Sequence, residues 1–432
     1  MSLRRTLLFL ALTANLLLPA QSLTPAQSAM MRAVDAQKVK AQSLLERLVN
    51  QNSGTFNTEG VKVVAAYMIA ELVELGFNVD LLSMESIRRG PHILAVKKGT
   101  RPAKPILLIG HMDTVFEPSS PFQRFELKPD GRTAVGPGTA DMKGGLVVMM
   151  TALRALRASD DWSNLNITVF LTADEEAPGD LAISRKDLIE QGKKAKAALC
   201  FETGVRGVTE DAVSTARRGF TGWELRSYGK AGHSGQMFTD KFGYGAIFEM
   251  SRILDEFQKT LREPNMTFNV GLMLGGADPK ADRSGQSSVS GKDNIIPGEA
   301  LARGEIRALS PEQVARVKDR MQGIVAKSLP GTRSQITFEE GYPPMAPTPG
   351  NRRLLRLLNE GNLAAGLPDV GELDPMQRGA GDISFVAPYV DSLSGLGLIG
   401  TGSHAVGEYA DLASIPRQAK RAALLIYRLA HE

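Results

Sequence analysis

The sequence predicts an α/β fold with a second, α+β domain inserted into the first. The chain has 432 residues, more than one hydrophobic core usually serves. Predicted strands and helices alternate between residues 78 and 201, as in a largely parallel sheet covered by helices. Between about 214 and 340 the order of elements changes to β-α-β-β-α-β, which is typical of a ferredoxin-like sandwich. After Gly341 helix and strand patterns resume, so both outer segments build the first domain.

Composition and charge exclude several classes of protein. Apolar residues make up 43% and charged residues 23%, as in an ordinary globular protein. Lys and Arg number 51 against 47 Asp and Glu, and Arg4 and Arg5 belong to a segment that we expect to be removed. A net charge of about +2 for the rest does not favour a nucleic-acid partner. Cys200 is the only cysteine, so we expect no internal disulfide and a buried position in a strand.

Residues 1–22 are predicted to be a secretory signal peptide. Arg4 and Arg5 precede an almost entirely apolar stretch, 6–18, and Pro-Ala-Gln-Ser follows at 19–22. An uncleaved membrane anchor is the alternative, but this apolar stretch is too short to span a bilayer comfortably. We therefore expect a periplasmic or secreted protein without stable membrane insertion after cleavage.

The first part of the first domain, 23–213, begins with helices and continues into the sheet. The pattern predicts helices at 26–50, 60–75, 145–158 and 184–191, and strands at 78–82, 92–97, 105–109, 167–172 and 197–201. Gly76 is placed to end the second of these helices as a C-cap glycine. Ligands gather at the carboxyl ends of strands in such sheets, so residues that follow these strands are candidates for function.

The inserted domain, 214–340, is predicted from four strands and two helices. The strands are 221–228, 266–274, 300–308 and 335–339, and the helices are 242–262 and 311–328, with Ser310 as N-cap and Pro311 at the first helical position. The second part of the first domain, 341–432, contains predicted helices at 351–364 and 416–430. We expect hinge motion where the insertion joins, near Thr215 and Gly341.

Three of the five histidines lie beside glycine or serine in loop-like contexts: His111, His233 and His404. One such histidine alone is more often a surface residue than a ligand. We interpret the other two, His92 and His431, as a strand residue and a C-terminal surface residue.

Five carboxylates are further candidates, four of them after predicted strands and Asp141 on a glycine-rich loop that leads into the helix at 145–158: Asp113, Asp141, Glu175, Glu176 and Glu202. Crowded acidic groups raise one another's pKa, and a bound dication removes that cost. Any one of them alone is equally consistent with a helix N-cap or a solvated turn, and we interpret Asp174 in that way. Imidazole with carboxylate and no thiolate suits zinc, manganese or cobalt, and the oxygen-rich set suits two ions ~3.5–4 Å apart.

Motifs along the whole mature chain resemble, in order and spacing, the M20 family of zinc peptidases and amidohydrolases, most closely its glutamate carboxypeptidase branch. These motifs are GHMDTVF, GPGTADMKGG, ADEE, FETG, GKAGHSG, DNIIP and GTGSHAVGEY. The resemblance implies a di-zinc, aminopeptidase-like catalytic domain and an inserted domain that serves as lid and dimerisation domain.

The resemblance also implies roles for individual residues and two Zn²⁺ ions per subunit. His111, Asp141 and Glu202 would hold one ion, while Asp141, Glu176 and His404 would hold the other. Asp113 would orient His111, and Glu175 would be the general base.

Further roles concern the substrate and a second subunit. His233 of one subunit would stabilise the oxyanion in the other, which implies a homodimer through the inserted domain; a surface turn is the alternative. Asn294 and Arg307 would bind the substrate carboxylate or carbonyl, although Arg307 is also consistent with a solvated edge charge.

Two departures from the family pattern leave glutamate specificity open. Glu-Glu-Gly-Tyr at 339–342 lacks the basic residue of the glutamate carboxypeptidase branch, and Arg-Gly-Ala-Gly-Asp at 378–382 replaces Gly-Gly-Gly-Thr-Asp. Arg378 is the candidate to compensate.

We therefore expect an exported, dimeric, di-zinc hydrolase that cleaves the amide bond next to a free carboxylate in a small peptide and releases the C-terminal amino acid. An N-acyl amino acid amidohydrolase is the alternative. A catalytically silent binding protein on the same fold is a third hypothesis, and the intact set of candidate ligands and base argues against it.

Overall fold

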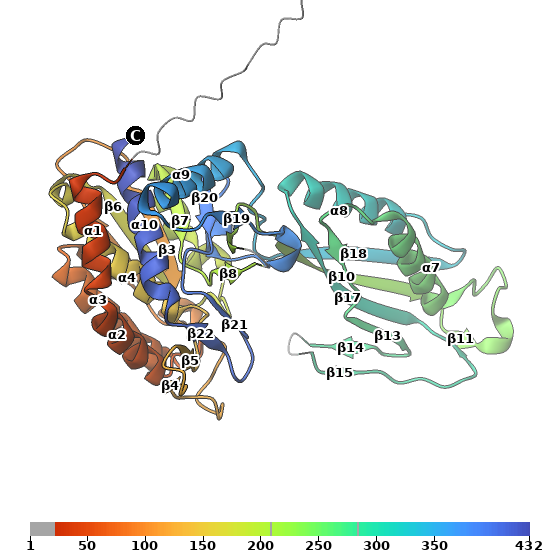
Figure 1. Cartoon of the computed structure of the whole chain (residues 1–432). Coiled ribbons are helices and arrows are strands. Elements are labelled where there is room, and N and C mark those ends of the chain that lie inside the picture. Colours follow the sequence, from red (N-terminus) through yellow and green to blue (C-terminus); the bar gives the residue numbers. More distant parts are fainter. Residues whose placement is uncertain (1–21, 208–209, 283–284) are drawn as a thin grey trace, which may run out of the picture.

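The computed structural model describes residues 22–207, 210–282 and 285–432, so nearly all of the predicted signal peptide lies outside the described residues. These residues form two domains that lie side by side and are joined by two chain connections (Figure 1). No helix in the described ranges is long and apolar enough to cross a membrane.

A six-stranded mixed sheet forms the centre of the first domain. In spatial order its strands are β1 (Asn78–Leu82), β2 (His92–Lys97), β6 (Ile167–Thr172), β3 (Ile106–His111), β7 (Ala197–Cys200) and β20 (Ser392–Ser394). Only β2 pairs antiparallel with its neighbours, and all other pairings are parallel, as the alternation of strands and helices predicts. β3 and β6 are buried along their whole length, which is why they read as continuous apolar runs.

Helices cover this sheet: α1 (Pro25–Asp35), α2 (Lys38–Asn50), α3 (Thr58–Glu74), α4 (Lys143–Arg157), α5 (Leu181–Ser184), α6 (Lys186–Lys194), α9 (Pro349–Ala365) and α10 (Ser414–His431). The predicted helix 26–50 is broken at Ala36, although neither glycine nor proline marks the break. There the main-chain amide of Gln37 donates to the carbonyl of Val34, and the Gln37 side chain donates to the carbonyl of Ala33. The predicted burial of Cys200 in a strand is confirmed, since it lies in β7 and is 1% exposed.

The second domain has its own sheet and its own core. Its elements are β10 (Gly219–Gly229), α7 (Gly245–Thr260), β12 (Thr267–Phe268), β13 (Leu272–Gly276), β17 (Glu299–Ala308), α8 (Pro311–Val325) and β18 (Thr332–Glu340). β17 pairs with β10, β12 and β13, and β10 also pairs with β18, all antiparallel. This is the predicted β-α-β-β-α-β order, with the predicted strand 266–274 divided into β12 and β13. Ser310 caps α8 by accepting a hydrogen bond from the amide of Gln313.

Short strands, which the sequence pattern does not predict, complete the fold. They are β4 (Glu126–Leu127), β5 (Thr133–Val135), β21 (Gly400–Thr401) and β22 (Tyr409–Asp411) in one small sheet, β8 (Val205–Arg206), β9 (Asp211–Val213) and β19 (Val370–Glu372) in another, and the pairs β11 (Gly232–His233) with β16 (Ile295–Ile296) and β14 (Lys280–Ala281) with β15 (Ser287–Ser288). Strands of two or three residues are too short to show a period.

The two connections between the domains pair with each other. Arg217 and Met345 exchange two backbone hydrogen bonds of 2.9 Å, and the amide of Phe220 donates to the carbonyl of Tyr342 at 2.9 Å. The connections thus form a short two-stranded joint next to β20, where Ser214 bridges Ser394.

Candidate metal centre

The predicted metal ligands converge at the carboxyl ends of three adjacent strands. His111 ends β3, Glu176 follows β6 and Glu202 follows β7. Asp141 comes from the loop before α4, and His404 comes from the loop between β21 and β22. Because β6, β3 and β7 are neighbours in the sheet, residues that are distant in sequence meet at one edge.

Asp141 lies between the two histidines. Its Oδ1 is 3.3 Å from Nε2 of His111, and its Oδ2 is 3.4 Å from Nε2 of His404. Oε1 of Glu202 lies 3.7 Å from the same nitrogen of His111, and Oε2 of Glu176 lies 3.0 Å from that of His404. His111, Asp141 and Glu176 can direct one ligand atom each to a common point. The five side chains therefore meet around the Asp141 carboxylate, and the one group of three that can share an ion within the described residues draws on both predicted ligand sets.

Asp113 contacts the ring nitrogen of His111 that points away from the cluster. Nδ1 of His111 lies 3.1 Å from the Asp113 carbonyl oxygen and 3.4 Å from its carboxylate, which leaves Nε2 free to face the cluster. The buried Asp113 carboxylate also accepts hydrogen bonds from the amides of Glu175 and Glu176 at 3.1 Å, and from the hydroxyl of Thr55 at 2.6 Å. One side chain thus fixes both the imidazole and the segment that carries the proposed base.

The charges of the cluster fit a cation. Burial, together with the neighbouring carboxylate of Asp141, raises the pKa of Glu176 to about 7, although the hydrogen bond from His404 opposes this change. Burial likewise raises the pKa of Glu175 well above its usual range. Hydrogen bonds to Asp141 and Glu176 raise the pKa of His404 to about 11. Two imidazoles and three carboxylates without sulfur are ligands that suit zinc or similar divalent ions.

Glu408 supports the Asp141 loop and was not identified from the sequence, although it lies in the GTGSHAVGEY motif. Its buried carboxylate accepts hydrogen bonds from the amides of Ala140 at 2.7 Å, Asp141 at 2.9 Å and Gly138 at 3.2 Å. These bonds fix the loop that presents Asp141.

The interpretation of Asp174 as a helix N-cap or solvated turn is wrong. Its side chain is fully buried and accepts hydrogen bonds from Arg185 at 2.5 Å and from Ser184. His92, which is indeed a strand residue, lies 3.1 Å from the same carboxylate. Arg185 was not identified from the sequence; it is itself fully buried and also donates to Asp382 at 2.7 Å.

Arg217 and Arg378 lie at the Glu202 side of the cluster. Nη1 of the buried Arg217 is 3.8 Å from the Glu202 carboxylate, and its other nitrogens donate to the carbonyls of Gly379 at 2.8 Å and Ala380 at 2.7 Å. Arg378 donates to the carbonyl of Thr203. Burial lowers the pKa of Arg378, and the Arg217 charge lowers it further, while Glu202 and Asp141 oppose the change.

Arg217 also explains one departure from the family pattern. A Cβ atom at Gly381 would lie 2.7 Å from Nη1 of Arg217. The guanidinium therefore fills the space that a threonine would need. Arg307 lies on β17 near the same loop, since a Cβ atom at Gly379 would be 3.3 Å from its Nη1, and it pairs with Glu305 at 2.7 Å.

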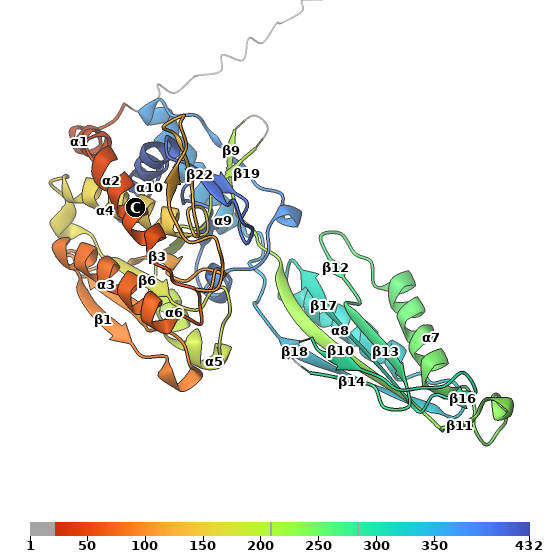
Figure 2. The same cartoon turned by 90° about the horizontal axis from the view of Figure 1, so that it is seen from below.

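His233 and Asn294 lie far from the cluster of their own chain. His233 is exposed on β11, whose partner β16 directly follows Asn294, and the amide of Ser234 donates to the Asn294 carbonyl at 2.9 Å. Both views place β11 at the end of the second domain that points away from the first domain (Figures 1 and 2).

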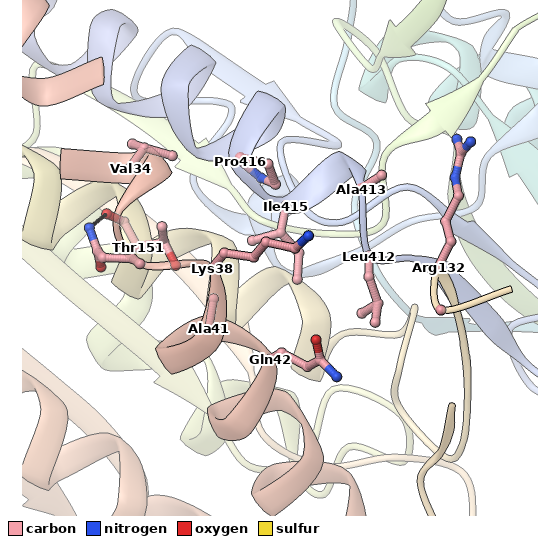
Figure 3. A pocket seen from close by; sticks show the side chains of 12 residues that line it. Val34, Lys38, Ala41, Gln42, Arg132, Thr151, Leu412, Ala413, Ile415 and Pro416 are labelled. Atoms are coloured by element: carbon pink, nitrogen blue, oxygen red, sulfur yellow. Dashed lines mark hydrogen bonds between the residues drawn. The ribbon is translucent and has the colours of Figure 1, made fainter. Parts of the chain in front are cut away.

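A separate cavity of about 330 Å³ lies between α1, α2 and the start of α10 (Figure 3). Val34, Ala41 and Ile415 form part of its apolar wall, and Lys38 lies at its side. It shares no lining residue with the histidine–carboxylate cluster.

A histidine–carboxylate cluster with a shared aspartate, at the strand ends of an α/β domain, defines a metal-dependent hydrolase. The model of peptidase family M20/M25/M40 matches residues 107–428, and the chain belongs to this family. It is 30% identical over 395 residues to carboxypeptidase G2 of Pseudomonas sp. (strain RS-16), covering 89% of this chain and 88% of that one.

The chain is also similar to a desuccinylase and to a peptidase of known structure. Succinyl-diaminopimelate desuccinylase of Variovorax paradoxus (strain S110) is 22% identical over 399 residues, covering 86% of this chain and 93% of that one. The solved structure of the Bacillus subtilis protein YXEP, described as a dinuclear metal-binding M20 peptidase, has a TM-score of 0.61 at 14% identity and covers 91% of this chain and 99% of that one. The structural likeness supports the predicted fold, and the family match supports a hydrolase over a silent binding protein.

Proposed function

We propose that this M20 hydrolase cleaves the amide bond next to a free carboxylate and releases a C-terminal amino acid from a small peptide. The observation that carries this proposal is Arg378. Its partly buried guanidinium lies beside Glu202 and the second cation Arg217, and within the described residues it forms no ion pair. A guanidinium in this setting favours a carboxylate ligand, and the substrate would supply one.

Each of the two predicted ligand sets would take one Zn²⁺. His111, Asp141 and Glu202 are the ligands that we assign to one ion, and Asp141, Glu176 and His404 those of the other. Bound at these positions, two divalent ions would supply Lewis acidity, lowering the pKa of water and polarising the scissile carbonyl.

Glu175 is the residue that we assign as general base. Its carboxylate takes a proton from water as the hydroxide adds to the amide carbon, and it returns this proton to the nitrogen as the carbon–nitrogen bond breaks. Arg378 holds the carboxylate of the leaving amino acid, which places the scissile bond at a fixed distance from Glu175. The products are a carboxylate and a free amino acid.

A second subunit would complete the site. His233 and Asn294 lie at the far end of the inserted domain, so they serve catalysis only if they reach the cluster of another copy. We therefore propose a homodimer through the inserted domain, in which His233 stabilises the oxyanion of its partner's reaction. The residues 1–22 favour export to the periplasm or beyond.

Mixing two inactive variants tests the shared site. His233→Ala and Glu175→Ala subunits, unfolded together and refolded at equal amounts, should regain about a quarter of wild-type activity, because half of the dimers are mixed and each has one complete site. Absence of recovery in dimers that are shown to be mixed would contradict the shared site.

The alternative activity is the hydrolysis of N-acyl amino acids, and the desuccinylase relatives favour it. It differs in that the acyl side need not be an amino acid. Three compounds with the same C-terminal residue separate the hypotheses: a dipeptide, the N-acetyl amino acid in which acetyl replaces the first residue, and the C-terminal amide of the dipeptide. Their rates are measured with Zn²⁺-loaded protein, with Glu175→Gln as control. A carboxypeptidase or amidohydrolase of this kind rejects the C-terminal amide, and equal rates for acid and amide would contradict both.

A further inference from the structure

Tyr342 lies where the inserted domain rejoins the first domain. Its side chain belongs to the second connection, directly after β18 and Gly341, and is 5% exposed. The ring stacks on Phe220 of β10 with centroids 5.9 Å apart and meets Phe385 of the first domain edge-on at 4.9 Å. Both connections and the first domain therefore pack against one ring.

The Tyr342 hydroxyl links a buried arginine to the main chain of Glu175. It accepts a hydrogen bond from Nη2 of Arg185 at 2.8 Å and donates one to the Glu175 carbonyl oxygen at 3.0 Å. A guanidinium has no acceptor, so the direction of this chain of hydrogen bonds is fixed. Burial raises the pKa of Tyr342 well above its usual range, which keeps the hydroxyl protonated as a donor.

Arg185, which begins this chain of hydrogen bonds, is itself held by two buried carboxylates. Its Nε donates to Asp382 at 2.7 Å and its Nη1 to Asp174 at 2.5 Å, and all three side chains are buried. Asp174 is itself held by His92 at 3.1 Å. These residues belong to the first domain, so the position of the Tyr342 hydroxyl is fixed from that side.

Glu175 depends on such external support because it lies in no helix or strand. Its amide nitrogen donates to Asp113 at 3.1 Å, and its carbonyl accepts the hydrogen bond from Tyr342. These two bonds hold the peptide groups on either side of its Cα atom. Loss of either one frees the backbone that aims the carboxylate.

We propose that Tyr342 is a positioning residue that couples the joint between the domains to the general base. Tyr342 and Phe220 stack on each other and belong to the two connections, so motion of the inserted domain displaces both rings. The Tyr342 hydroxyl then transmits this motion to the main chain of Glu175. This inference rests on the proposed function, in which Glu175 is the base.

The variant Tyr342→Phe tests the inference, since it keeps the ring and removes only the hydroxyl. We expect kcat for the best dipeptide to fall about tenfold or more while KM stays within about threefold, because the base is misaligned but the substrate contacts remain. Metal content and the unfolding temperature should stay close to wild type. Tyr389→Phe is the matched control, since Tyr389 is 53% exposed on the first domain.

A double variant separates positioning from a general structural effect. In a Glu175→Asp background the base is already displaced, so adding Tyr342→Phe should change kcat by less than about twofold. The same fold loss in both backgrounds, a loss in KM alone, or an unchanged kcat in Tyr342→Phe would overturn the inference. Full activity of Glu175→Ala would instead overturn the proposed function together with it, and this result does not depend on Tyr342.

Discussion

Replacing Arg378 tests the assignment of the substrate carboxylate. Arg378 is placed beside Glu202 and donates to the carbonyl of Thr203, which leaves further N–H groups of the guanidinium for a ligand. A carboxylate held by two charge-assisted hydrogen bonds at about 1.5–3 kcal/mol each gains at least about 3–4 kcal/mol in such a setting. Arg378→Ala should therefore lower kcat/KM for a dipeptide about 10²–10³-fold, at roughly 1.4 kcal/mol per tenfold.

The assay compares each dipeptide with its C-terminal amide under steady-state conditions. Wild type should strongly prefer the acid, Arg378→Ala should lose the preference, and Arg378→Lys should fall between them because a lysine keeps the charge without the planar pair of donors. Equal losses on acid and amide would mean that Arg378 supports the loop and does not bind the carboxylate. An unchanged kcat/KM would refute its involvement altogether.

Three further predictions concern metal binding, thiol reactivity and stability. His404→Ala should reduce bound zinc from about two ions to about one per chain by elemental analysis, because it removes a proposed ligand of one ion only. The control His431→Ala, at the exposed C-terminus, should keep both ions. Two retained ions in His404→Ala would contradict the assignment. The thiol of Cys200, whose pKa burial raises to about 12, should react with a disulfide reagent only after unfolding, and stoichiometric labelling of the native protein would contradict its burial. Leu358→Ala in the core should lower the free energy of unfolding by about 3 kcal/mol. Leu363, on the same helix, is 63% exposed, and Leu363→Ala should change the free energy of unfolding by less than about 1 kcal/mol. Equal effects of the two substitutions would mean that α9 packs differently.

Strong local patterns made most of the fold predictable. The apolar run of β3, the Ser-Pro start of α8 and the strand–helix alternation each have one simple physical reading. The break between α1 and α2 has no such signal, because neither glycine nor proline stands there and Gln37 has ordinary helix propensity. Breaks of this kind follow from tertiary packing and not from local propensity.

The site was predictable where residues stand at strand ends and less so where distant segments meet. His111 and His404 were candidates because they lie beside glycine or serine in loop-like contexts, and Asp141 because it lies on a glycine-rich loop. Their roles as ligands came from the resemblance to the M20 family. Arg217 and Arg185 could not, because a buried arginine carries no local signal and is defined only by partners far along the chain. The same holds for Gly381, whose lack of a side chain makes sense only beside Arg217.

Product analysis by mass spectrometry tests the central claim most directly. Zinc-loaded protein lacking residues 1–22 is incubated with a mixed pool of dipeptides, N-acyl amino acids and their C-terminal amides, with Glu175→Ala as control. The proposed function predicts that the wild type alone releases free amino acids, and only from pool members that carry a free carboxylate next to the cleaved amide bond. Release of amino acid amides, or the same products from Glu175→Ala, would contradict it.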